Sequence, residues 1–345
     1  MYCKDFPVKK IEGLILRASQ VLPPLSDWDG AELCTIIPVL SVALSGDITL
    51  RSEILGTLVG IASYLADYAL DRQVIEASRS AAASCLFSII GKYQVNMKEC
   101  IGLNILKNQI GPVVSNAIED RSPDSSNENM SSLEEAMGLL GLVASAASQR
   151  GRASASTTDE VARFLVLISC EGAASAPNIG ITNPLDCSEH ALGQDQFEIS
   201  SIAASALGSI FSVAPHVNPF AKQRLAHLVI PIVLSYSHPS IADMNGAELG
   251  CLMCASHVVC CISEKAVGQQ NLEKLTSIIV GGLEKAVQIL CTDNKTSPMP
   301  PMILQDLLYL LLVSLLKLHN QCPSMVRNVG RASSQILFIQ FISSH

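Results

Sequence analysis

Apolar residues recur along most of the chain at spacings of three and four positions, which is the period of one face of an α-helix. The clearest example runs from Ala31 to Asp67. Its apolar positions follow this spacing up to Leu44, stop at the dipeptide Gly46-Asp47, and resume at Ile54. Glycine often ends a helix and aspartate often begins one, so we expect two helices that pack as an antiparallel pair around this dipeptide.

The same periodicity predicts helices over most of the remaining chain. No segment shows the sustained alternation of apolar and polar residues that is typical of a half-buried strand, so the expected fold class is all-α. We expect a capping box at Ser131 and Glu134, and a helix start at Thr158 or Asp159. The helices predicted after the first pair are 73–93, 104–120, 131–148, 157–172, 195–215, 219–239, 245–268, 271–291, 301–320 and 323–341.

Two segments lack this periodicity. Residues 121–131 are polar and are expected to form a loop, and residues 172–194 are long enough for an inserted loop or a binding loop between helices. Neither segment changes the composition enough to mark a domain boundary. We therefore expect a single helical-repeat domain over residues 1–345.

Three of the predicted helices carry a proline inside an apolar run: Pro38 in IIPVL, Pro231 in VIPIVL and, in a weaker form, Pro112 in IGPVV. In this respect the chain resembles HEAT and armadillo repeats, in which the first helix of a pair often holds such a proline. The resemblance implies an α-solenoid, in which antiparallel helix pairs stack into a right-handed superhelix. Each pair then buries its apolar face against its neighbours, because it cannot do so alone.

A second feature of the resemblance is an arginine after the turn of a helix pair. DITLRSEIL supplies Asp47 and Arg51, EASRSAAAS supplies Arg79, and PSMVRNVGRAS supplies Arg327. The resemblance implies that each arginine reaches an acidic turn residue of its own or the next repeat. We therefore expect these three arginines to stabilise the stack and not to bind partners.

The resemblance is best over residues 31–93, weaker over 219–268 and 301–341, and poorest over 121–194. The last stretch, SSQILFIQFISSH, is apolar and offers no polar capping helix. Terminal repeats of a solenoid normally need a polar outer face. We therefore expect the chain to be a segment of a longer solenoid.

The stretch CLMCASHVVCC places four cysteines and a histidine within a few helical turns. Residues three apart on a helix drift by about 60° of arc per step, so Cys251 and Cys260 lie on opposite faces and cannot share one ion. Only pairs among Cys254, His257 and Cys261 could bind one ion together, with further ligands from elsewhere. We expect a buried helix, with a zinc site or a nucleophilic cysteine as the alternatives.

Composition and charge argue against some classes of protein. The residues are 49% hydrophobic but only 4% aromatic, which favours helix packed on helix, and the net charge of −8 argues against a nucleic-acid surface. The 12 cysteines lie mostly inside apolar segments, so we expect reduced, buried thiols and a protein of the cytoplasm or also the nucleus. The most apolar run, Leu307 to Leu316, makes a helix of only about 15 Å, so we expect no membrane span.

No phosphate-loop, zinc-protease or serine-hydrolase motif occurs in the sequence, so we expect neither an enzyme nor a bound cofactor. The expected function is a protein–protein interaction scaffold or adaptor in a multi-subunit complex. Binding would involve the inner row of second helices and the 172–194 loop. Two alternatives use the same architecture: a nuclear-transport or cargo-carrier receptor, and the solenoid accessory segment of a large enzyme such as a giant kinase.

Overall fold

The computed structural model describes residues 8–22, 30–46, 48–71, 74–93, 101–113, 126–148, 152–171, 194–213, 219–236, 244–261, 267–291, 299–324 and 326. Within these ranges every regular element is a helix and no strand occurs, which confirms the all-α prediction. The helices are α1 (Val8–Val21), α2 (Gly30–Ser45), α3 (Ser52–Leu70), α4 (Glu76–Tyr93), α5 (Ile101–Ile105), the π-helix η2 (Leu106–Ile110), α7 (Ser126–Ser148), α8 (Arg152–Glu171), α9 (Gln194–Val213), α10 (Pro219–Tyr236), α11 (Gly246–Cys261), α13 (Gln269–Cys291) and α14 (Pro301–Gln321).

The chain divides into two compact units, which we call unit 1 (Met1–Thr158) and unit 2 (Asp159–His345). Each unit buries its own set of aliphatic side chains. The expectation of a single helical-repeat domain over residues 1–345 stays a prediction.

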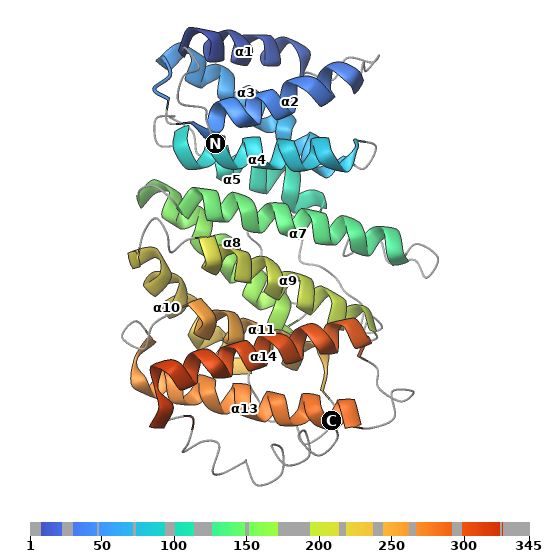
Figure 1. Cartoon of the computed structure of the whole chain (residues 1–345), viewed down its shortest axis with the longest axis vertical. Helices are drawn as coiled ribbons and strands as arrows, with labels where there is room; N and C mark the ends of the chain where they lie inside the picture. Colours follow the sequence, from blue (N-terminus) through green and yellow to red (C-terminus); the bar gives the residue numbers. More distant parts are fainter. Residues whose placement is uncertain are drawn as a thin grey trace. The chain divides into compact units, whose positions relative to one another are not determined.

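In unit 1, α4 is the central helix: it packs against α2, α3 and α7 (Figure 1). Helix α1 packs against both α2 and α3. Helix α3 has one apolar face for this packing, because its buried residues recur at spacings of four, three and four positions: Ile54, Leu58, Ile61 and Leu65. The prediction that α2 and α3 are separate helices is confirmed. They do not pack on each other as the expected pair, because each packs mainly on α1 and α4.

Polar side chains fix the helix ends in unit 1. The ammonium of Lys92, in the last turn of α4, donates to the carbonyl oxygens of Leu44, Ser45 and Gly46 at the end of α2. The last carbonyls of a helix have no partner inside the helix and carry partial negative charge, so a lysine is stabilising there. This contact holds the end of α2 against α4.

Arg51 is the N-terminal flanking residue of α3, and it pairs with Glu12 of α1. Its Nε donates to both carboxylate oxygens of Glu12, at 3.0 and 2.9 Å, and its Nη2 lies 2.7 Å from Oε2. The Glu12 side chain is 4% exposed, and the hydrogen bonds from Arg51 hold the pKa of this carboxyl below its usual value. An enclosed carboxylate that accepts from one guanidinium therefore links α1 to the start of α3.

Three helix starts differ from the sequence predictions. Helix α3 begins at Ser52 and not directly after Asp47, which itself lies outside the described residues. Helix α7 begins at Ser126, so residues 126–131 of the predicted 121–131 loop are helical and Ser131 is not a cap. Helix α8 begins at Arg152, and the hydroxyl of Thr158 donates to the Ala144 carbonyl oxygen at 2.9 Å instead of capping a helix.

Two further predictions concern helix interiors and loops. Pro38 lies inside α2 and Pro231 lies inside α10, as the sequence predicted. Pro112 is in a helical turn after η2. The predicted 172–194 loop lies outside the described residues apart from Gln194, which begins α9.

In unit 2, α11 is the central helix and packs against α9, α10, α13 and α14. Two glycines mark the positions where neighbouring helices approach most closely. A Cβ at Gly250 of α11 would overlap the backbone carbonyl of Ser169 in α8, and one at Gly282 of α13 would overlap Leu252 of α11. The neighbouring Gly281 faces open space, so only Gly282 of this glycine pair permits close helix packing.

Our first prediction compares two glycine-to-alanine variants of unit 2. Gly250→Ala should destabilise the protein by about 2–4 kcal/mol, because the new methyl group meets backbone and cannot be relieved by a side-chain rotation. Gly281→Ala is the control, and it should stabilise by about 0.5–1 kcal/mol through helix propensity alone. Urea unfolding followed by far-ultraviolet circular dichroism measures both, and equal effects of the two variants would contradict the close approach of α11 and α8.

Our second prediction concerns the link between α1 and α3. Arg51→Glu should lower the melting temperature, because it places a second carboxylate beside the enclosed Glu12. Arg51→Lys keeps the charge but loses the forked geometry, so it should have a smaller effect of the same sign. Thermal unfolding of both variants against the wild type is the measurement, and an unchanged melting temperature in Arg51→Glu would argue that the arginine has no structural role.

Candidate functional site

Helix α11 carries the cysteine and histidine residues that the sequence singled out. Residues 249–256 are buried without interruption, which is more than two helical turns, so this part of the helix has no solvent-exposed face. The prediction of a buried helix is confirmed. Asn245 caps the start of this helix, since its side-chain oxygen accepts from the backbone N–H of Glu248 at 2.8 Å.

The thiols of α11 face a third thiol from α8. Hydrogen bonding of the protonated Cys170 thiol with Cys251 and Cys254, together with burial, raises the pKa of Cys170 far above its usual value. All three cysteines are buried and free. A thiol that stays protonated is neither a nucleophile nor a metal ligand, so Cys170 is typical of an inert core cysteine. Sequence reasoning missed Cys170, because only the folding of α8 onto α11 brings it to the other two.

His257 faces a different helix. A Cβ at Gly208 of α9 would overlap its ring, so the imidazole packs directly on the α9 backbone. Its Nε2 is enclosed and accepts or donates no hydrogen bond among the described residues. Burial lowers the pKa of His257 to about 4, so the ring is neutral at physiological pH.

The last two cysteines of α11, Cys260 and Cys261, are only partly buried. The thiol of Cys260 lies 3.2 Å from the hydroxyl oxygen of Ser314 in α14, and Cys261 is half-buried. Of the candidate ligands Cys254, His257 and Cys261, Cys254 contacts Cys170 of α8, whereas the ring of His257 packs on Gly208 of α9. The observed contacts therefore direct these two side chains to different helices. Among the residues that the structure describes, no group of three or more His, Cys, Asp or Glu side chains is arranged to hold a metal ion.

A hollow on the surface of unit 1 is the stronger candidate for binding. We call it the α4–α7 groove, and its cavity volume is about 470 Å³. Arg79 of α4 and Glu135 of α7 close one end with an ion pair, 2.6 Å from Nη1 to Oε2. The groove is lined by Ala69, Glu76, Arg79, Ser80, Ala83, Glu135, Gly138, Leu139 and Leu142.

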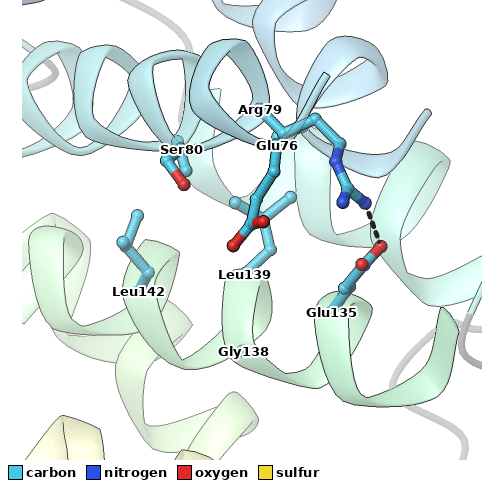
Figure 2. Close-up of a pocket in the computed structure, with 9 residues that line it drawn as sticks. Glu76, Arg79, Ser80, Glu135, Gly138, Leu139 and Leu142 are labelled. Atoms are coloured by element: carbon cyan, nitrogen blue, oxygen red, sulfur yellow. Dashed lines mark ion pairs between the residues drawn. The ribbon is translucent and has the colours of Figure 1, made fainter. Parts of the chain in front are cut away.

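The lining combines small, apolar and charged groups. Figure 2 shows Glu76 reaching from α4 toward α7, above Gly138 and Leu139, while Arg79 turns to Glu135. Glu76 is exposed, and a Cβ at Gly138 would meet nothing within 4 Å. An exposed carboxylate beside apolar surface suits the docking of a peptide side chain more than it suits a reaction. No sequence signal pointed to Gly138.

The predicted arginine pairs form with acidic residues of a different kind. Arg51 and Arg79 both pair, but Glu12 and Glu135 are helical residues and not the expected turn residues. Arg327 lies outside the described residues.

Within the described part of the chain, two helices, α3 and α14, are long and apolar enough to cross a membrane by length and composition alone. Core helices of soluble proteins pass the same test, and part of each helix is buried in its unit: 44% of the apolar window in α3 and 33% in α14. The expectation of no membrane span therefore stays a prediction. The exposed part of α14 carries apolar side chains, among them Tyr309 and Leu316.

Comparison with known proteins gives no assignment: no protein-family model matches the chain, and the search of curated proteins finds no significant match.

Our third prediction follows from the enclosed His257. Between pH 6.5 and pH 4 the unfolded chain binds a proton at this residue and the folded chain does not, so stability should fall as the pH falls. The full loss is about 3 kcal/mol at most. Urea unfolding at several pH values measures it, and His257→Gln should flatten this part of the profile. An identical pH dependence in the variant would show that the ring is hydrated in the folded protein.

Proposed function

We propose that this chain is a non-enzymatic scaffold that binds other proteins through helix pairs stacked as in HEAT and armadillo repeats. The observation that carries the proposal is the α4–α7 groove, which lies between consecutive packed layers of unit 1 and offers an apolar floor beside an exposed carboxylate. Such grooves accept side chains of a bound segment, because a partner can bury apolar area there without rearranging the core.

The packing of unit 1 supports the repeat architecture. Helices contact their near neighbours along the chain, α1 with α2 and α3, and α4 with α2, α3 and α7. Two arginine pairs join helices that are not consecutive, Arg51 to Glu12 and Arg79 to Glu135. A succession of local contacts with polar links between layers is what stacked repeats require.

The partners we propose are proteins of a multi-subunit complex in the cytoplasm or the nucleus. A second candidate is a nuclear-transport or cargo receptor of the same architecture. The net charge of −8 favours this candidate for a basic cargo, since long-range attraction would raise the rate of encounter.

Our fourth prediction tests the groove. Gly138→Trp should fill it without disturbing the core, because the position is exposed and a Cβ there meets no other atom within 4 Å. Gly60→Trp is the matched control, since Gly60 is an equally open helical glycine of unit 1 outside the groove. The tagged full chain is used to capture partners from cell extract, and the eluates are weighed under native conditions.

The expected result is a stoichiometric partner protein with the wild type and Gly60→Trp, and capture weakened by about tenfold or more with Gly138→Trp. Retention of the partner by Gly138→Trp would show that binding uses another surface. Absence of any stoichiometric partner would contradict the scaffold itself. Circular dichroism of both variants checks that each remains folded.

A further inference from the structure

The α4–α7 groove is formed by one face of each of its two helices. Helix α4 contributes Glu76, Ser80 and Ala83, which are four and three positions apart and therefore lie on the same side of the helix. Helix α7 contributes an apolar floor that includes Leu139 and Leu142. An occupant of the groove therefore meets polar groups from α4 and apolar surface from α7.

The charged side chains that line the groove do not balance. Arg79 and Glu135 neutralise each other in their ion pair, and both are partly enclosed, at 19% and 31% exposure. Glu76 is exposed, and among the residues that the structure describes it has neither a hydrogen bond nor an ion pair. Figure 2 shows the pair of Arg79 with Glu135 and the Glu76 carboxylate extending toward α7. The lining therefore carries one uncompensated negative charge beside apolar surface.

This charge selects among the segments that could enter the groove. An acidic side chain would be repelled by Glu76, and it could bind Arg79 only by displacing Glu135 from its ion pair. A wholly apolar segment would remove water from the Glu76 carboxylate without offering a hydrogen bond in return, which costs free energy. A basic side chain has neither penalty, because its cation pairs with the carboxylate as water leaves.

Lysine and arginine also match the apolar floor of the groove. Each has an aliphatic stem that packs on apolar surface while the charged head reaches a polar group. The stem would lie on Leu139 and Leu142, and the head would meet Glu76. Arginine is the better match, because its planar guanidinium donates two parallel hydrogen bonds to a carboxylate. It keeps further N–H groups for the hydroxyl of Ser80, one helical turn along α4.

We infer that the α4–α7 groove binds a basic side chain of a partner segment, arginine in preference to lysine, and that Glu76 is the carboxylate that pairs with it. This inference rests on the proposed function, since it names the chemistry of the segment that the groove would bind. The net charge of −8 attracts basic segments at long range and acts in the same direction. The specificity, however, would come from Glu76.

The test selects peptides from a random peptide library displayed on phage, with the immobilised full-length chain as the target. The wild type should enrich peptides that carry an arginine or lysine next to an apolar residue. Glu76→Gln should lose this preference, because the groove then has no net charge. Glu76→Lys should replace it by a preference for aspartate or glutamate. Gly138→Trp, which fills the groove, identifies the peptides that bind there, since they should not bind this variant.

Glu134→Gln is the matched control. Glu134 is an exposed glutamate of α7 that does not line the groove, and its substitution changes the net charge of the protein by the same amount as Glu76→Gln. It should keep the basic preference of the wild type. Circular dichroism of each variant checks that it remains folded.

The affinity of a selected peptide for the full-length chain is then measured by fluorescence polarisation. Its arginine is replaced by citrulline, which has nearly the same shape but no charge, or its lysine by norleucine. This replacement should weaken binding to the wild type by about tenfold, as expected for a charged hydrogen-bonded pair. It should have no effect on binding to Glu76→Gln, because the pair is already lost there.

The outcomes separate this inference from the proposed function. Peptides that Gly138→Trp excludes but that lack a basic residue would overturn the inference and leave binding by the groove intact. So would a basic preference that persists in Glu76→Gln. Loss of the preference in Glu134→Gln would show that overall charge selects the peptide, which also overturns the inference. Failure to enrich any peptide that Gly138→Trp excludes would overturn both the inference and the assignment of binding to the groove.

Discussion

The close approach of α11 to its neighbours is the constraint on which unit 2 depends. Where Gly250 meets the Ser169 carbonyl, the two helix backbones touch and no side chain fits between them. Because other helices approach α11 from its remaining sides, small residues are required around most of its circumference. The sequence GAELGCLMCASHVVCC supplies them as glycine, alanine, serine and cysteine. The cysteines then follow from packing, since a reduced thiol is a small apolar group.

The fold class could be predicted from the sequence because helical periodicity survives wherever one face is buried. The positions of helix caps could not be predicted in this way, because a polar side chain can bond a group other than the start of its own helix. Ser131 and Thr158 have the residue types of helix caps, but the structure places both inside longer helices, and the Thr158 hydroxyl bonds Ala144 instead. Helix α1 was missed altogether, although Ile11, Ile15, Ala18 and Leu22 have the helical spacing. Glu12, the partner of Arg51, lies in this helix, so it was missed as well.

The candidate site was predictable only in part, for a physical reason. From the sequence we expect that one helix cannot gather its own ladder of cysteines around an ion, because residues three apart drift around the helix. The sequence could not show the long-range neighbours that decide the chemistry, which are Cys170 beside Cys254 and Gly208 beneath His257. Similarly, the pairing of Arg79 was expected, but its partner Glu135 is more than fifty positions away and helical. The residue type indicates that a charged side chain needs a partner, but which residue is the partner depends on the fold.

The two units also differ in how they specify their packing. In unit 1 the specific contacts are charged groups at helix ends, such as Lys92 on the last carbonyls of α2 and Arg51 on Glu12. In unit 2 contact glycines such as Gly250 act beside ion pairs between helices, Arg224 with Asp159 and Lys285 with Glu248. Aliphatic core positions tolerate exchange among residues of similar volume. Charged pairs and contact glycines do not, because one substitution leaves a charge unpaired or a backbone displaced. A chain that shares this fold would therefore need to match it at few positions, and those positions are polar pairs and glycines more than the leucines that dominate the pattern.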